Sequence, residues 1–85
     1  METEEIKSTV RKYITEHIFN KQSLITFTDD SPLISGRLMD SIVTLKMITH
    51  LEDLLRIEFK AHEVTATNLD SVNIITDFLL RKLNK

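Results

Sequence analysis

Residues 36–42 read Gly-Arg-Leu-Met-Asp-Ser-Ile, and they mark the place where an irregular segment runs into a long amphipathic helix. From Ser41 to about Arg56, apolar residues recur at helical spacing, which predicts a helix with one core-facing stripe. The stripe is predicted to consist of Ile42, Leu45, Ile48, Leu51 and Leu55, widened by Met47 and Leu54. A serine at the start of such a helix can cap it, or can present its hydroxyl to another molecule in the positive field of the helix N-terminus.

A second main helix is predicted before this one, over about residues 4–18. Apolar residues recur there at helical spacing, and Thr3 is suited to be the N-cap. Glu4 and Glu5 fall in the first turn, where the helix dipole favours negative charge.

The chain after the central helix predicts a third main helix and one minor element. Residues 57–59, Ile-Glu-Phe, are interpreted as the extended exit from the central helix, with both apolar side chains in the core. Weaker signals over residues 61–66 predict a turn or a short helix. Residues 68–71, Asn-Leu-Asp-Ser, carry an N-cap signal for a last helix over residues 72–83.

The segment between the first two helices, residues 21–40, sustains neither the helix period nor the strand period. It contains the only proline and the only glycine of the chain, and residues 29–32, Asp-Asp-Ser-Pro, predict a turn. Its apolar residues indicate an ordered loop that packs across the core, and they are Leu24, Ile25, Phe27, Leu33, Ile34 and Leu38. The predicted fold class is therefore all-α: a small bundle of three main helices plus one short helix, with a long ordered loop between helices one and two.

Length and composition limit the classes of function. A chain of 85 residues has room for one domain, which we expect to span residues 1–85. The core of so small a domain is modest, and this disfavours a large enclosed active site. The net charge of -2 and the absence of a lysine and arginine cluster before the last five residues disfavour a nucleic-acid partner. No apolar stretch approaches the roughly 20 residues that span a membrane, and the acidic N-terminus lacks the features of a signal peptide. We therefore expect a soluble, cytoplasmic monomer without membrane insertion.

Cysteine is absent, so the chain has no thiol of its own and no cysteine metal site. His17, His50 and His62 lie on separate predicted elements, which disfavours a metal site built from histidines. Asp29 and Asp30 do not begin a calcium loop, because residues 32–34 are Pro, Leu and Ile where ligands and a glycine are needed.

The central helix and its approach resemble the signature region of acyl carrier proteins. Residues 40–42, Asp-Ser-Ile, resemble the Asp-Ser-Leu motif of that family, and residues 43–45 and 51–53 resemble its recognition helix. The acidic first helix, the long loop, Gly36 before the serine and residues 68–72 at the start of the last helix also fall where that family has them. The resemblance covers essentially the whole chain.

The resemblance implies that Ser41 is the residue to which a phosphopantetheinyl transferase attaches 4′-phosphopantetheine from coenzyme A. It implies that Asp40 helps to engage the transferase, while Asp40 can equally be an N-cap. The chain would then be a stand-alone carrier and not an enzyme, holding an acyl group as a thioester for acyl-activating, condensing or acyl-transfer enzymes. The residues expected to contact these partners are Arg37, Met39, Ile42, Val43, Lys46, Glu52 and Asp53.

Two positions depart from the pattern of fatty-acid carriers. Val43 and Lys46 stand where those carriers have acidic residues that dock on basic patches of their partners. This predicts a specialised lipid or polyketide-type pathway. The alternatives left open are a peptidyl or D-alanyl carrier and an unmodified helical interaction module, while an enzyme is disfavoured because no base lies near a candidate nucleophile.

The tripeptide occurs a second time, almost unchanged, at residues 70–72, Asp-Ser-Val. Only one helix follows Ser71, whereas the family has a recognition helix and two further elements after its modified serine. Ser71 is therefore predicted to be a cap. The apolar residues near Ser41 are expected in the core or at its rim, and they are Met39, Ile42, Leu45 and Met47.

Overall fold

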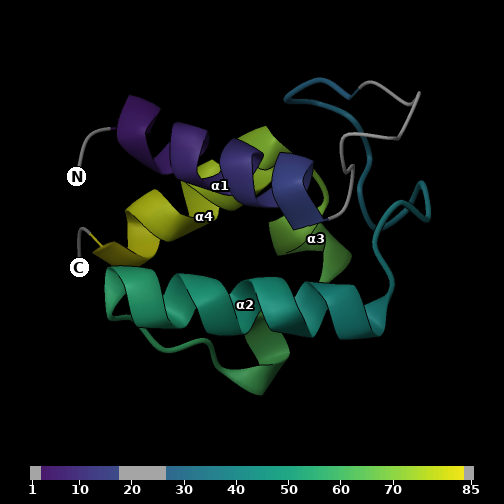
Figure 1. Cartoon of the computed structure of the whole chain (residues 1–85). Helices are drawn as coiled ribbons and strands as arrows, with labels where there is room; N and C mark the ends of the chain where they lie inside the picture. Colours follow the sequence, from purple (N-terminus) through teal and green to yellow (C-terminus); the bar gives the residue numbers. More distant parts are fainter. Residues whose placement is uncertain (1–2, 18–26, 84–85) are drawn as a thin grey trace.

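The computed structural model describes residues 3–17 and 27–83, and its regular elements over those ranges are helical (Figure 1). They are α1 (Thr3–His17), α2 (Ser41–Leu55), the 3-10 turn η1 (Ala61–Glu63), α3 (Ala66–Leu69) and α4 (Val72–Leu83). The predicted small bundle of three main helices and a short one is confirmed, and each main helix begins and ends within about one residue of its predicted bounds. The predictions for Ile18, Leu24, Ile25 and the first part of the loop fall outside the described residues.

The core lies where α1, α2 and α4 converge, with α1 packed directly against α4. Figure 1 shows α2 running below the other two long helices, with its N-terminal end at the right of the view. The loop before α2 contributes Leu33 and Met39, which are 0% and 3% exposed. Burying a side chain of this size stabilises the fold by about 1.5–3 kcal/mol. The described part of the loop, residues 27–40, is therefore an ordered part of the core, as predicted.

The buried face of α2 differs from the predicted stripe. Ile42, Leu45 and Leu54 are 66%, 55% and 48% exposed, so their predicted place in the core is wrong. The buried residues of the helix are Thr44, Met47, Ile48 and Leu51. Thr44 can be buried because its hydroxyl donates to the carbonyl oxygen of Asp40 at 2.7 Å, which satisfies its polar atom. The first five residues of α2 thus include two exposed large apolar side chains, Ile42 and Leu45, that periodicity alone would bury.

The loop is fastened to the start of α4 by Asp70. One carboxylate oxygen of Asp70 accepts the backbone N–H groups of Ile34 and Ser35, each at 2.8 Å, and the other accepts the Ser35 hydroxyl at 2.6 Å. The carbonyl oxygen of Asp70 accepts the N–H of Leu33 at 2.6 Å. The Ser35 hydroxyl, helped by the Ser35 and Ile34 amides, holds the pKa of Asp70 below its usual value against the opposing effect of desolvation. One residue therefore fixes three consecutive loop residues, two through its side chain and one through its backbone carbonyl.

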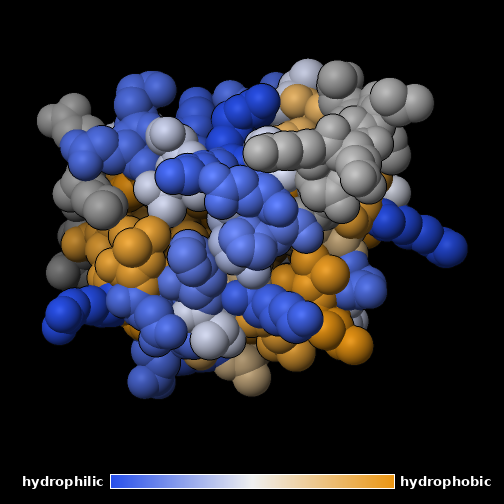
Figure 2. Space-filling model, in the orientation of Figure 1, coloured by the Kyte–Doolittle hydropathy of each residue, from blue (hydrophilic) through white to orange (hydrophobic). Residues whose placement is uncertain are grey.

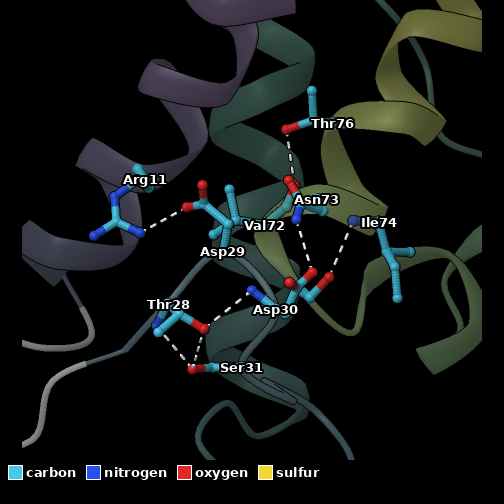
Figure 3. A network of polar contacts seen from close by, with 10 residues as sticks. Arg11, Thr28, Asp29, Asp30, Ser31, Val72, Asn73, Ile74 and Thr76 are labelled. Atoms are coloured by element: carbon cyan, nitrogen blue, oxygen red, sulfur yellow. Dashed lines mark hydrogen bonds and ion pairs between the residues drawn. The ribbon is translucent and has the colours of Figure 1, made fainter.

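A second attachment lies at the predicted turn of residues 29–32 (Figure 3). Asn73 of α4 donates its side-chain amide to Asp30 at 2.7 Å and its backbone N–H to the carbonyl oxygen of Asp29 at 3.0 Å. From α1, Arg11 reaches the carboxylate of Asp29 at 2.6 Å. The turn is closed by the N–H of Ser31, which donates to the carbonyl oxygen of Thr28 at 3.2 Å. The turn is thereby tied to both α1 and α4.

Gly36 is required by a close approach of two backbone segments. A Cβ atom at this position would lie 2.3 Å from the carbonyl oxygen of Pro32, which is far inside van der Waals contact. The same carbonyl accepts the N–H of Gly36 at 3.2 Å, so the two residues form a tight turn. This turn lies five residues before Ser41 and directs the chain toward α2.

Residues 57–60 after α2 lie outside the helices, with Ile57 and Phe59 half-buried against the core, and the segment is fastened at two points. The N–H of Phe59 donates to the Glu52 carboxylate at 2.8 Å, and the Phe59 ring lies 5.6 Å from the Phe78 ring. In η1, Glu63 accepts the N–H of Lys60 at 2.8 Å and pairs with Lys82 at 2.7 Å. The Lys60 N–H, followed by the Lys82 ammonium, holds the pKa of Glu63 below its usual value. These contacts hold residues 57–63 against α2 and α4.

The C-terminal end of α2 offers a direct test of the backbone geometry. Arg56 has φ 55° and ψ 50°, a left-handed conformation that costs a residue with a Cβ about 1–2 kcal/mol. Arg56→Gly should therefore be more stable than Arg56→Ala by about 1 kcal/mol in urea unfolding. The matched pair is Asp53→Gly and Asp53→Ala inside the same helix, where the order should reverse by about the same amount. Equal stabilities for the two Arg56 variants would contradict the described helix end.

Candidate functional site

The site begins with the cap of α2, which is provided by Asp40. Its backbone is extended, with φ -91° and ψ -178°, and its carboxylate accepts the N–H of Val43 at 2.8 Å. Its carbonyl oxygen accepts both the N–H of Thr44 at 2.9 Å and the Thr44 hydroxyl. Asp40 is therefore the residue that caps α2, a role for which both Asp40 and Ser41 were candidates.

Ser41 is the first residue of α2, and its side chain is exposed. Within residues 3–17 and 27–83, its hydroxyl makes no hydrogen bond. The first N–H groups of a helix lack partners within it, and the helix dipole places partial positive charge there. The structure thus presents an accessible hydroxyl beside groups that favour a negatively charged substituent.

Ser71 provides an internal comparison, because it also follows an aspartate at the start of a helix. It is 4% exposed, and its hydroxyl oxygen accepts the N–H of Ile74 at 3.0 Å. The prediction that Ser71 is a cap is confirmed. The carboxylate of the preceding Asp70 points to the loop, and Ser71 caps α4. At the start of α2 the roles are exchanged, because Asp40 is the cap and Ser41 is not. The two similar tripeptides therefore differ in which side chain is left accessible.

A surface groove of about 400 Å³ opens beside Ser41. One wall comes from the loop and α2, and the other comes from the segment that joins η1 to α3. The lining is mostly apolar. The loop and α2 contribute Ile34, Met39, Asp40, Ser41, Thr44 and Leu45, and the opposite wall consists of Val64, Thr65 and Ala66. A group attached to Ser41 would have an apolar surface directly next to it.

The expected partner-contacting residues do not all lie on the surface. Arg37, Ile42, Lys46 and Asp53 are exposed, and Val43 and Glu52 are half-buried. Met39 differs from the others, because it is 3% exposed and belongs to the core, and it reaches the surface only where it lines the groove beside Ser41.

Leu45 must be added to the exposed residues near Ser41. It was assigned to the core stripe, yet with Ile42, Lys46 and Thr49 it lines a shallow hollow of about 340 Å³ on the outer side of α2. Figure 2 shows apolar surface gathered over the N-terminal part of α2, at the lower right of the view. The sequence signal that could have revealed this is Thr44, the polar residue that turns inward in place of Leu45.

Other chemistries find little support among the described residues. No group of three or more histidine, aspartate or glutamate side chains there is placed to hold a metal ion. His17 and His50 instead stack against Tyr13, with ring centroids 4.3 Å and 4.7 Å away. In the described part of the chain, every helix is too short or too polar to cross a bilayer.

No protein-family model matches the chain, and no curated protein sequence matches it significantly.

Substitution of Asp40 can separate its capping role from any role in recognition. Asp40→Ala should lower the free energy of unfolding by about 1 kcal/mol, because the Val43 N–H loses its acceptor. Asp40→Asn keeps an oxygen in the same place and should stay within a few tenths of a kcal/mol of the parent protein. Urea unfolding monitored by circular dichroism gives both values. Equal losses for the two variants would show that the charge, and not the cap, stabilises the helix.

Proposed function

We propose that the protein is an acyl carrier protein, a stand-alone carrier that is not itself an enzyme. It would carry 4′-phosphopantetheine on Ser41 and an acyl group on that arm as a thioester. The observation that supports this most strongly is the accessible Ser41 hydroxyl, which makes no hydrogen bond to residues 3–17 or 27–83 because Asp40 caps α2. The resemblance of residues 40–53 to the signature and recognition helix of carriers points to the same residue.

The chemistry of attachment fits the surroundings of Ser41. In the transfer, the Ser41 Oγ would form a bond to the pantetheine-bearing phosphorus of coenzyme A, adenosine 3′,5′-bisphosphate would leave, and the hydroxyl proton would pass to a base of the transferase. The product is a phosphodiester monoanion, which the free N–H groups and positive field of the α2 N-terminus stabilise. The Asp40 carboxylate is turned toward the Val43 N–H, which reduces its repulsion of that anion.

Each chemical part of a carrier can be assigned to either the chain or the arm. The bound group supplies the thiol that forms the thioester, which this cysteine-free chain lacks. The chain supplies a fixed attachment point, because the loop before Ser41 is held by Asp70 and by the Gly36 turn. The groove beside Ser41 would shelter the first part of the arm or of its cargo against Leu45 and Val64.

The cargo belongs to a specialised pathway in this proposal. The first turn of α2 contains no acidic residue, and Lys46 is exposed one turn after Ile42. A face of this kind does not complement the basic docking patches that fatty-acid carriers meet. An aminoacyl cargo, as on peptidyl and D-alanyl carriers, fits the same face, and loading assays with acyl-activating and amino-acid-activating enzymes distinguish the two.

The proposal is tested by incubating the purified protein with coenzyme A, magnesium and a broad-specificity phosphopantetheinyl transferase. Intact-mass spectrometry should show one added phosphopantetheine group on nearly all of the protein. An unchanged mass with several different transferases would overturn the assignment.

A further inference from the structure

The outer face of α2 carries an apolar pair that the fold does not use. Ile42 and Leu45 are 66% and 55% exposed, and both lie within four residues of Ser41. They sit on the shallow hollow beside Lys46 and Thr49, so they form one continuous surface and not two isolated side chains. Apolar surface that is left open next to a functional residue commonly marks a site of protein contact.

Two cations flank this pair in the sequence, Arg37 before it and Lys46 directly after it. Arg37 and Lys46 are exposed, and neither forms an ion pair within the described ranges. The partial positive charge of the α2 N-terminus adds to their field.

Several carboxylates of the described residues keep their negative charge, but each is directed toward a partner within the protein. Asp40 caps the helix, and Glu52 accepts the N–H of Phe59. Glu63 pairs with Lys82, and Asp70 binds the loop. On α2, Asp53 is exposed, but it lies seven residues, or about two turns, after Lys46 and thus toward the far end of this face.

We propose that the first half of α2 docks on a partner protein whose contact surface is apolar and bordered by aspartate and glutamate side chains. Ile42 and Leu45 are the apolar anchors, and Lys46 and Arg37 select the acidic border. This polarity is opposite to that of a carrier with an acidic recognition helix. That the partner is an enzyme acting on a Ser41-bound arm rests on the proposed function, whereas the polarity of the surface rests on the exposed residues alone.

Charge complementarity favours an acidic protein surface over an anionic membrane. The chain has a net charge of -2, so a lipid headgroup layer would attract the Lys46 side and repel much of the remaining surface. A carboxylate-bordered patch on a protein faces only the local positive area. Electrostatic matching of this local kind mainly sets encounter rates and partner choice.

Two synthetic amphipathic helical peptides serve as probes, one with a leucine stripe bordered by glutamate and its twin with lysine in place of glutamate. The unmodified protein is labelled with nitrogen-15 and titrated with each peptide. The glutamate peptide should shift the backbone amide signals of residues 42–49 with a weak, salt-sensitive affinity, and the lysine peptide should leave them unchanged. Equal binding of both peptides, or binding of neither, would overturn the proposed polarity.

Matched variants assign the effect to individual residues. Lys46→Glu should weaken binding of the glutamate peptide about tenfold and allow the lysine peptide to bind, whereas Lys12→Glu on α1 changes the net charge equally and should have little effect. Ile42→Ser should also weaken binding about tenfold, with Ile74→Ser on α4 as its control. Equal effects of a variant and its control would contradict the assignment, and so would shifts of the same amides by phosphatidylglycerol vesicles in place of the peptide.

This experiment and the test of the proposed function can fail separately. Peptide binding is measured on protein without phosphopantetheine, so it does not depend on modification of Ser41. Modification without selective peptide binding would leave the carrier assignment in place and remove the docking proposal. Selective peptide binding without modification by any transferase would keep the docking proposal and remove the carrier assignment.

Discussion

Ser41→Ala is expected to abolish attachment of phosphopantetheine completely while leaving the fold unchanged. The hydroxyl is the atom that accepts the phosphopantetheinyl group, so its loss removes the reaction and does not merely slow it. The fold should not respond, because the Ser41 hydroxyl makes no hydrogen bond within the described residues and Asp40 provides the cap. The free energy of unfolding should change by less than about 0.5 kcal/mol, as for other exposed positions. Intact-mass spectrometry and urea unfolding measure the two parts of this prediction.

Ser71→Ala is the matched control and should show the opposite combination. Loss of its hydroxyl leaves the Ile74 N–H without its capping acceptor, which should cost about 1 kcal/mol of stability. Modification should nevertheless proceed to completion, because Ser71 is buried and is not the attachment site. A phosphopantetheine group that is retained in Ser41→Ala and lost in Ser71→Ala would reverse the assignment of the two serines.

Asp70→Ala is expected to have the largest effect on stability of the polar substitutions considered. It removes the acceptor for two loop amides and for the Ser35 hydroxyl at once. Bonds to a charged acceptor contribute more than neutral ones, and with allowance for partial solvent exposure we expect a loss of about 2 kcal/mol. Urea unfolding measures the loss, and faster hydrogen exchange at the Ile34 and Ser35 amides should locate it in the loop.

Asp77→Ala on the same helix is the control for this substitution. Asp77 is exposed and makes no hydrogen bond or ion pair among the described residues, so its loss should change stability by less than about 0.5 kcal/mol. If Asp70→Ala were as mild as Asp77→Ala, the clamp would not stabilise the loop. If Asp70→Ala were destabilising without faster exchange at residues 34 and 35, the stabilising contact would lie elsewhere.

Acid should act on the same clamp. The folded pKa of Asp70 is lowered, so its stabilising contribution is present above the unfolded pKa, near 3.8, and is lost as pH falls through the lower folded value. Between pH 7 and pH 5 the contribution should be constant. Stability measured against pH should therefore fall less steeply below about pH 4 in Asp70→Ala than in the parent protein. Parallel curves would indicate that the Asp70 pKa is unperturbed.

The helices could be predicted from the sequence because the signals that define them are local. Caps and periodicity lie within a few residues of each helix end, as at Asp40 for α2 and Ser71 for α4. The orientation of α2 could not be predicted in the same way. Ile42 and Leu45 satisfy the period, but the helix turns Thr44 toward the core in place of Leu45, and only the packed structure reveals this orientation.

The same distinction between local and distant signals applies to the candidate site. Ser41 could be predicted as the candidate attachment residue, because its tripeptide and the helix after it are contiguous in the sequence. The support beneath it could not, since Asp70 acts on Ile34 and Ser35 across 36 and 35 residues. From the sequence, Asp70 indicates only a helix start, and nothing local shows that its carboxylate turns toward a distant loop. Met39 was expected both in the core or at its rim and among the partner contacts, and its burial, which places it in the core, depends on how the loop crosses the core.

The measurement that tests the central claim most directly is tandem mass spectrometry of the protein after treatment with coenzyme A and a phosphopantetheinyl transferase. The account predicts a single phosphopantetheine group located on Ser41, with Ser71 unmodified. A group on any other residue, or no group with several transferases of different specificity, would contradict it.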